Sequence, residues 1–402
     1  MHTSEVRLHH RRRNALFTLF FLIGVVMSSW ITRTPAIRDA LGASIAEMGM
    51  VLFGLSVGSM SGILSAGFFV RRLGNRVVAR IGMLLVVAGL LAMALGTAVQ
   101  QAWVVAFGLG LIGVGMGLSE IAINIDGAHV ERLLARPVLP ALHGFFSLGT
   151  VCGAGVGLLL TSAAVAVNLH LAVVACLCLP VVLWCVGFIP DETVEAGRDA
   201  APAQASGARS QAVWRDPRLL MIGFIVLAMA FAEGSANDWL PILMIDEHGF
   251  DPASGALVFL GFAAAMTLGR FCGGYFLARF GRAAVLRASA VSGVIGLSLV
   301  IFSTDPVLAG LAVLLWGLGA SLGFPVALSA AGDSGPDPAT RVRIAATAGY
   351  IAFLVGPPML GFVGEHYGLR SAMLIVLAGV ALAVFACSAA GQGHRRAGVP
   401  SV

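Results

Sequence analysis

The sequence predicts an all-α membrane protein with twelve transmembrane helices, arranged as two six-helix repeats. Three observations lead to this fold class: an apolar composition, a series of apolar segments that are each long enough to cross a bilayer, and a match between the two halves of the chain. Of the 402 residues, 58% are hydrophobic and only 11% are charged, whereas soluble proteins carry about 25% charged residues. A mean hydropathy of +0.93 points the same way.

Twelve segments could each form one membrane crossing, which needs about 20 predominantly apolar residues. They lie at residues 14–34, 44–70, 77–97, 103–127, 138–164, 169–188, 217–240, 253–277, 284–303, 307–331, 343–363 and 371–390. The basic run before the first segment superficially resembles the start of a signal peptide. Because no small-x-small cleavage site precedes a soluble domain, we interpret residues 14–34 as the first membrane helix.

The stretch between the sixth and seventh segments is polar, rich in small residues and contains Gly and Pro. Such a composition cannot bury a core and is typical of a linker. We therefore expect a six-helix bundle at residues 1–188, a cytoplasmic linker at 189–216 and a second six-helix bundle at 217–402.

The two halves also match each other in sequence. A shift of 207 residues superposes Gly74 on Gly281 and His143 on Tyr350. Glycine is common, with 51 residues, so one coincidence is weak. The whole set of matches falls in one register at equivalent helices, which indicates a parallel duplication.

Arginine placement predicts the orientation in the membrane. All 25 basic residues are arginine, and they lie between the apolar segments rather than in one patch, which favours topology over nucleic-acid binding as their explanation. With the N-terminus inside, only Arg33, Arg38 and Arg370 fall on the outer side, while Arg270 lies within a helix. We expect both termini to be cytoplasmic, in a bacterial inner membrane.

Two polar stripes interrupt the fourth and fifth apolar segments. Glu120 and Asn124 lie one helical turn apart on one helix face, and His143 and Ser147 have the same spacing on the next helix. A carboxylate in hydrocarbon costs about 2.5 to 3.5 kcal/mol, so such a residue usually faces a bundle interior or a watery cavity. The amide, hydroxyl and imidazole groups can bind sugar or polyol hydroxyls, and a desolvated Glu120 can take a proton. The alternative is a structural network that locks the two helices together.

Further candidate site residues lie on other helices. On the seventh segment Glu233 and Asn237 repeat the four-residue spacing, with Glu233 as a second ligand or as a partner of Arg33, and Asp238 is interpreted as an exposed residue at the helix end. We expect the indoles of Trp30 and Trp239 to stack on the apolar face of a sugar ring. We expect Tyr350 to line the cavity from the C-terminal half. A gating or structural role is expected for Arg33, Arg72, Arg279, Asp126 and Arg270, with Asp126 in an ion cluster at the cytoplasmic end of its helix.

The six cysteines all lie inside apolar runs without metal-type spacing, which indicates packing rather than redox or metal chemistry. A nucleotide-binding loop is absent from the sequence, and no nucleophile, base and orienting group share a plausible arrangement. We expect no metal, no cofactor and no enzymatic activity.

The organisation of the chain resembles the major facilitator superfamily. The turn from Gly67 to Arg76, which includes Arg72, looks like the signature turn of that superfamily, and the turn from Gly274 to Arg282, which includes Arg279, looks like its second copy. The acidic residue of the signature is replaced by arginine at position 71 and by alanine at position 278. The resemblance implies two halves that rock around a central cavity, and a monomer.

Within that superfamily the chain resembles the fucose-proton symporter group and the YbjJ-type bacterial inner-membrane proteins. The similar motifs are residues 118–124, 143–149, 232–240, 321–329 and 356–361. The resemblance implies that Glu120 takes the proton and that His143 stands where the group has a polar sugar ligand. The acid that the group carries on its first helix is missing, because that region reads Ser28-Ser-Trp-Ile-Thr-Arg-Thr-Pro35.

The sequence therefore predicts a secondary transporter in the lipid bilayer that moves a small polyhydroxylated solute by proton-coupled symport. A monosaccharide is the leading candidate for that solute. Two alternatives stay open. A proton-driven exporter of drugs or metabolites is favoured if the cavity is mainly apolar. A membrane sensor that binds a ligand without transport is the other.

Overall fold

A computed structural model describes residues 2–136, 138–190, 213 and 215–391. The expected linker at 189–216 falls for the most part outside these residues. The described chain is helical and contains no strand. The first bundle holds α1 (His2–Ile31), α2 (Thr34–Leu41), α3 (Ile45–Ala98), α4 (Ala102–Leu134), α5 (Leu139–Ser162) and α6 (Val167–Val186). The second holds α8 (Pro217–His248), α9 (Pro252–Phe302), α10 (Pro306–Gly332), α11 (Pro338–Tyr367), α12 (Leu369–Ala386) and the short η2 (Cys387–Ala390).

Ten helices in the described part of the chain are long and apolar enough to cross a membrane. Two of them, α3 and α9, are much longer than one crossing, and each is divided by a glycine with non-helical backbone angles. The φ angles of Gly74 and Gly281 are 81° and 74°, in the region that favours glycine. Counting α3 and α9 as two crossings each gives the predicted twelve.

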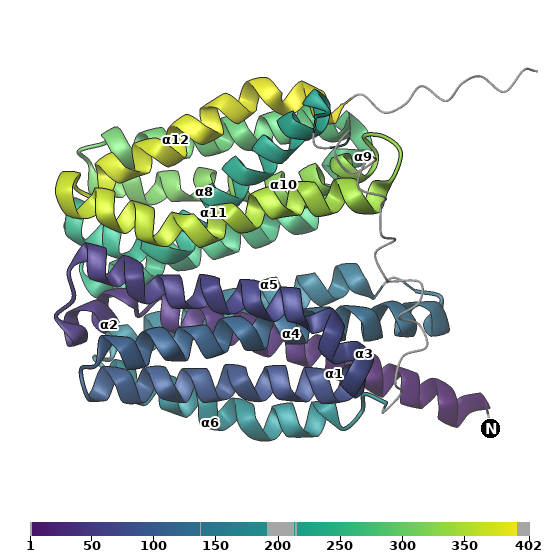
Figure 1. The fold of residues 1–402 in the computed structure, drawn as a ribbon. Helices are drawn as coiled ribbons and strands as arrows, with labels where there is room; N and C mark the ends of the chain where they lie inside the picture. The colour runs from purple at the N-terminus through teal and green to yellow at the C-terminus, as the bar shows by residue number, and fades with distance from the viewer. Residues whose placement is uncertain (1, 137, 191–212, 214, 392–402) are drawn as a thin grey trace, which may run out of the picture.

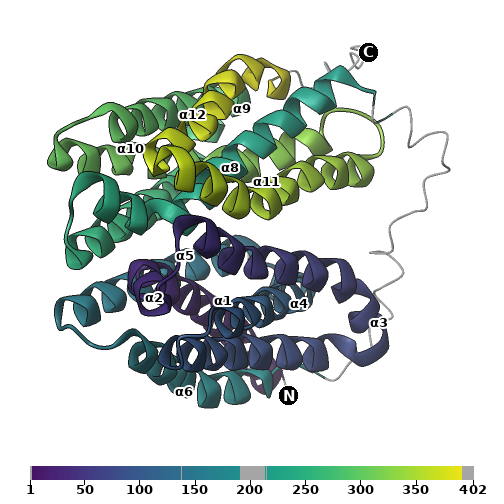
Figure 2. The ribbon, with the colours of Figure 1, turned by 60° about the vertical axis from the view of Figure 1, so that its left-hand side comes forward.

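The six-helix halves lie side by side, with α1–α6 in one bundle and α8–α12 in the other (Figure 1). The turned view keeps the two groups apart (Figure 2). Their internal packing is alike, because α3 packs on α4 as α9 packs on α10, and α1 packs on α5 as α8 packs on α11. Equivalent helices thus make equivalent contacts, as a duplicated unit would.

Glycines let the helices of the first bundle approach closely. A Cβ atom added at Gly58 on α3 would collide with the carbonyl oxygen of Gly110 on α4, and one added at Gly149 on α5 would collide with the carbonyl oxygen of Phe21 on α1. Lipid tails are as apolar as leucine, so helices in a bilayer associate through such close packing rather than through a hydrophobic drive.

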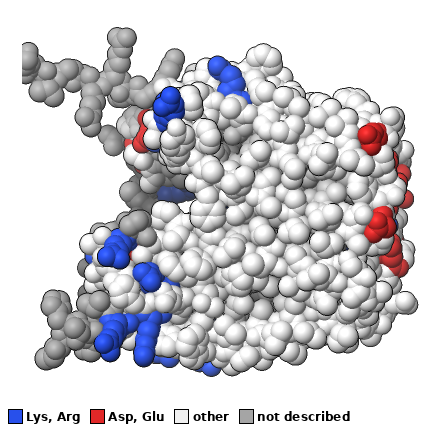
Figure 3. All heavy atoms as spheres, turned by 180° about the vertical axis from the view of Figure 1, so that it is seen from behind, with Lys and Arg blue, Asp and Glu red and all other residues white. Residues whose placement is uncertain are grey.

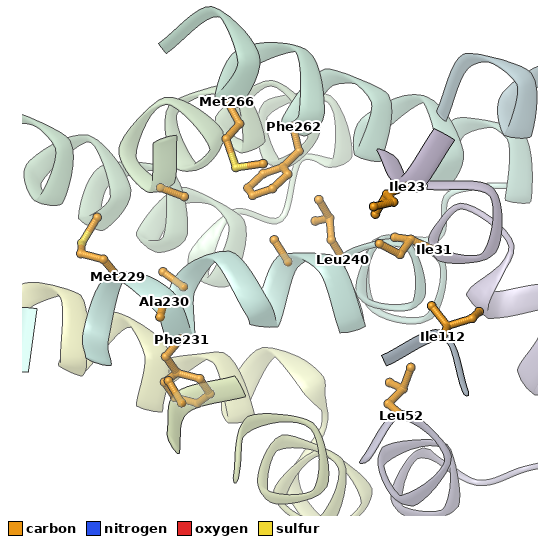
Figure 4. Packing of buried hydrophobic residues seen from close by; sticks show 14 of the residues in the cluster. Ile23, Ile31, Leu52, Ile112, Met229, Ala230, Phe231, Leu240, Phe262 and Met266 are labelled. Carbon is orange, nitrogen blue, oxygen red and sulfur yellow. The ribbon is translucent and has the colours of Figure 1, made fainter. Parts of the chain in front are cut away.

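A single hydrophobic core runs through both bundles. Figure 4 shows some of its members, among them Ile23 on α1, Leu52 on α3, Met229 on α8 and Phe262 on α9. The two bundles therefore share buried surface and make one molecule.

The start of α1 and the end of η2 lie at one end of the molecule, which we call the termini end (Figure 1). The opposite end, which carries α2, is called the distal end. On the face seen from behind, basic side chains gather at the termini end and acidic side chains at the distal end (Figure 3).

Several helices extend beyond the predicted spans, and two of the differences affect the site. The first crossing ends at Ile31, and Thr34 begins the separate short helix α2, with Pro35 in its first turn. The seventh crossing was predicted to end at residue 240, but α8 continues through Pro241 to His248. Within a bundle, neighbouring helices tolerate a helical proline, and the C-cap Gly249, with a φ of 70°, ends the helix instead.

Candidate functional site

A cavity of about 1210 Å³ lies between the two bundles. Its wall is made by α1, α3, α4 and α5 from the first bundle and by α8, α9, α10 and α11 from the second. The lining reaches Gly281 and Arg282, and Arg282 forms an ion pair with Asp333 after α10, at the termini end. The cavity therefore opens toward the termini end.

Contacts between the bundles close the distal end. Arg38 on α2 forms an ion pair with Asp246 on α8, and the carboxylate of Glu365 on α11 accepts a hydrogen bond of 3.1 Å from the backbone nitrogen of Ala46 at the start of α3. Deeper in, the Ser56 hydroxyl donates to the carbonyl oxygen of Phe353 at 2.7 Å. Burial alone would lower the pKa of Arg38, but its hydrogen bonds to Asp246 and to Asp39 outweigh that effect and raise the pKa.

Glu120 lies in the middle of α4 and lines the cavity. Its side chain is exposed there, and among the described residues it has no hydrogen-bond or ion-pair partner. Tyr350 on α11 faces the same cavity and lies close enough to interact electrostatically with Glu120. The structure thus brings together two predicted residues from opposite halves.

His143 and Ser147 line the cavity one turn apart on α5, as the spacing predicted. Ser147 is only 2% exposed, and its hydroxyl donates to the carbonyl oxygen of His143 at 3.1 Å. The imidazole packs edge-on against Phe20 of α1, with ring centroids 5.5 Å apart. His143 is thereby packed against its own bundle while it lines the cavity.

Arg270 on α9 links three of the predicted residues. Its guanidinium donates to a carboxylate oxygen of Glu233 on α8 at 2.9 Å and to the hydroxyl of Ser147, in the other bundle, at 3.3 Å. It also acts electrostatically on His143. Glu233 therefore pairs with Arg270, and not with Arg33, which donates to the carbonyl oxygen of Val165.

Asp238 was interpreted as an exposed helix-end residue, and that interpretation is wrong. Its side chain is 9% exposed and lines the cavity beside Asn237. The error follows from the predicted helix end, because α8 continues to His248 and so carries Asp238 into the membrane. The apolar run Leu240-Pro-Ile-Leu-Met-Ile245 is the signal that could have revealed it.

Three predicted ligands are not brought to the cavity. Trp30 and Trp239 are fully buried, with 0% exposure, and neither lines the cavity in this conformation. Asn124 is half-buried and also lies outside the lining.

The predicted gating residues are spread over the molecule. Asp126 on α4 accepts from the buried Arg12 on α1, while Glu131 binds the backbone nitrogens of Val138 and Leu139 at the start of α5. At Asp126 the expected cluster is thus an ion pair with α1, and Glu131, five residues later on α4, makes a separate backbone contact.

The signature-turn arginines are both exposed. Arg72 lies over the ring of Phe68, 4.6 Å from its centroid, and Arg279 lies over Phe280 at 5.7 Å. Among the described residues, no group of three or more His, Cys, Asp and Glu side chains could hold a metal ion.

Comparison with known proteins gives consistent results. A family model described as Major Facilitator Superfamily matches residues 16–343. An uncharacterized MFS-type transporter of Yersinia pestis is 29% identical over 378 residues, which cover 91% of this chain and 94% of that protein. The membrane protein MosC of Rhizobium meliloti is 25% identical over 388 residues, which cover 95% of this chain and 90% of that protein.

Solved structures share the fold. A mutant of the nucleoside transporter NupG superposes with a TM-score of 0.76 at 18% identity, covering 95% of this chain and 100% of that one. The Escherichia coli fucose:proton symporter FucP superposes with a TM-score of 0.65 at 18% identity, covering 94% and 98%.

Proposed function

The chain belongs to the major facilitator superfamily, and from that premise we propose that it is a proton-coupled carrier of a small polyhydroxylated solute. A monosaccharide is the leading candidate for that solute. It binds the solute in the central cavity and works by alternating access, as the two bundles rock around that site. As a membrane transporter of this family it is not an enzyme.

One observation carries the proposal: Glu120 is a carboxyl without a partner in the described chain, at membrane depth, on the wall of a cavity between two bundles. An ionisable group inside a transmembrane bundle is a functional-site hypothesis by default. A proton that binds there neutralises the carboxyl and can couple the proton gradient to movement of the solute. Each proton moved inward supplies about 2.3 kcal/mol per 100 mV of membrane potential.

The polar part of the wall suits hydroxyl groups. His143, Asn237, Tyr350 and the serines of α3 can each donate or accept hydrogen bonds, and they face one another across the cavity from both halves. The fold is shared with proteins whose names state nucleoside transport and fucose:proton symport, so the fold accommodates hydroxyl-bearing cargo.

The arrangement of charge supports an orientation. On the face that Figure 3 shows, arginines gather at the termini end, and cytoplasmic loops carry an excess of basic residues. We place the termini end in the cytoplasm of a bacterial inner membrane, so that this conformation is inward-open. The units are then the bundles at 1–188 and 217–402, joined by a cytoplasmic linker at 189–216, in a monomer.

A second candidate is a proton-driven exporter, and a specific observation favours it. Apolar side chains outnumber polar ones on the cavity wall, and Met27, Met60, Met116, Phe271 and Phe324 are among them. Methionine-rich surfaces adapt to varied ligands. An exporter would use the same carboxyl with the opposite coupling direction.

Uptake into liposomes tests the proposal. A panel of monosaccharides and polyols is offered with and without an imposed proton gradient, and wild type is compared with Glu120→Gln. We expect one solute to accumulate with the gradient, and the variant to lose accumulation yet still exchange solute across the membrane. Failure of every solute in the panel, with identical behaviour of wild type and variant, would move the exporter ahead.

A further inference from the structure

Asp238 differs from every other acidic residue on the cavity wall. Its side chain is 9% exposed, and in the described chain it receives no hydrogen bond and forms no ion pair. Glu233, five residues earlier on the same helix, is neutralised by Arg270 at 2.9 Å, whereas the unpartnered Glu120 is exposed to the cavity. Asp238 is thus the carboxyl that is both buried and unpartnered.

Asp238 lies far from the water at the distal end of α8. It lies ten residues before His248, the last residue of α8, and a helix rises about 1.5 Å per residue, which places it about 15 Å from the helix end. The next residues, Trp239 and Leu240, are both fully buried. A charged carboxylate at such a position is costly without a partner.

None of the described cationic side chains that line the same cavity is free to form an ion pair with Asp238. They are Glu120 from α4, His143 from α5, Glu233 from α8, Arg270 and Arg282 from α9, and Tyr350 from α11. Arg270 is bound to Glu233 and Ser147, and Arg282 is bound to Asp333. The described linings from α1, α3 and α10 add no ionisable side chain.

We propose that Asp238 is a second proton-binding carboxyl of the carrier, in the half opposite Glu120, and that it takes up a proton while the distal end is open and carries it through closure of that end. The inference rests on the proposed function for its role in transport. When the distal end opens, an Asp238 carboxylate oxygen takes a proton from water on that side. After closure around the neutral carboxyl, the O–H bond breaks and the proton passes to water in the cavity that opens at the termini end.

Infrared difference spectroscopy tests the proposal without any solute. The carbonyl stretch of a protonated carboxyl is recorded on the purified full-length carrier in liposomes, as the bathing solution is brought from neutral to alkaline pH. We expect the wild-type carrier to lose carboxyl-band intensity as the pH rises. Asp238→Asn should lack that part of the band at every pH, and Asp238→Glu should restore it at a shifted frequency. The matched control, Glu233→Gln, removes no such intensity because Glu233 is ion-paired.

The outcomes are separable. If Asp238→Asn has the same difference spectrum as wild type, Asp238 carries no proton and the inference falls, whatever the uptake assay gives. If Asp238→Asn lacks the carboxyl-band intensity while no sugar is transported, Asp238 is a proton-binding site and the proposed solute class is wrong. Size-exclusion profiles check folding, and if Asp238→Asn does not fold, the frequency shift in Asp238→Glu decides, with an unshifted band overturning the proposal.

Discussion

At the scale of single residues, the site depends on how each carboxyl is compensated. Glu233 has a fixed partner in Arg270, Asp126 has one in Arg12, and Glu120 has none in the described chain. A paired carboxylate stays charged and structural, whereas an unpaired one is free to exchange a proton. This difference separates the residues that hold the bundles from those that can couple transport.

Removing Arg270 should therefore expose Glu233 as an uncompensated charge. Breaking a buried ion pair by removing one partner costs about 3 to 5 kcal/mol. Because 26% of the Arg270 side chain remains exposed, we expect Arg270→Gln to lose about 1 to 3 kcal/mol of unfolding free energy. The thermal midpoint in detergent, followed by tryptophan fluorescence, measures the loss.

A double-mutant cycle identifies the cause of that loss. Adding Glu233→Gln to Arg270→Gln should restore much of the midpoint, because the stranded charge is gone. The control Arg279→Gln lies on the same helix with only a ring contact, and should change stability by less than about 0.5 kcal/mol. Additive effects of the two substitutions would show that the pair is not coupled.

The residues that could be predicted from the sequence are those whose environment is set by their own helix. Glu120, His143 and Ser147 interrupt apolar runs at helical spacing, and all three line the cavity. Asp238 was misplaced because its exposure depends on where α8 ends. Trp30 and Trp239 were expected to be near the substrate, but they are buried by neighbouring helices, which no local pattern reveals.

At the scale of helices, glycine decides how closely α3 and α4 approach. A Cβ atom at Gly58 would collide with the carbonyl oxygen of Gly110, whereas a Cβ atom at Gly110 would meet nothing closer than the Gly54 carbonyl oxygen at 3.6 Å. The same interface therefore offers a matched pair of positions, one that cannot accept a side chain without a collision and one that can.

We expect Gly58→Ala to lower the unfolding free energy by about 1 to 3 kcal/mol, the usual cost of overpacking. Gly110→Ala should be close to neutral, since 3.6 Å is an ordinary contact distance. Thermal midpoints of the two variants in the same detergent give the comparison. Equal midpoints would mean that α3 and α4 separate readily and that the close approach contributes little stability.

The number of crossings could be predicted from apolar length, because a bilayer fixes the length of a helix that spans it. The turn at Gly74 and its copy at Gly281 could be predicted from the repeat, and both have positive φ angles. The short helix α2 could not, because it spans only Thr34–Leu41 and its place depends on contacts with α8 and α3.

At the scale of the whole molecule, alternating access requires the distal contacts to open. The ion pair between Arg38 and Asp246 crosses from one bundle to the other, so it exists only while that end is closed. Arg38 also binds Asp39 at 2.9 Å, but that residue lies in the same bundle. The two aspartates therefore share a partner and differ in whether they join the halves.

We expect Asp246→Asn to shift the population toward the conformation that is open at the distal end, while Asp39→Asn leaves the population unchanged. A partly exposed ion pair contributes about 0.2 to 1 kcal/mol, which corresponds to a change of up to about five-fold in the ratio of the two states. Spin labels on cysteines at Ala43 and Tyr367 would report the width of the distal seam by pulsed electron paramagnetic resonance. The exposed cysteines must first be replaced, and these are Cys152, Cys176 and Cys272. A longer distance between the labels in both variants would mean that Arg38 acts through its charge on the whole distal surface. An unchanged distance in both variants would mean that the Glu365 and Ser56 contacts keep the distal end closed.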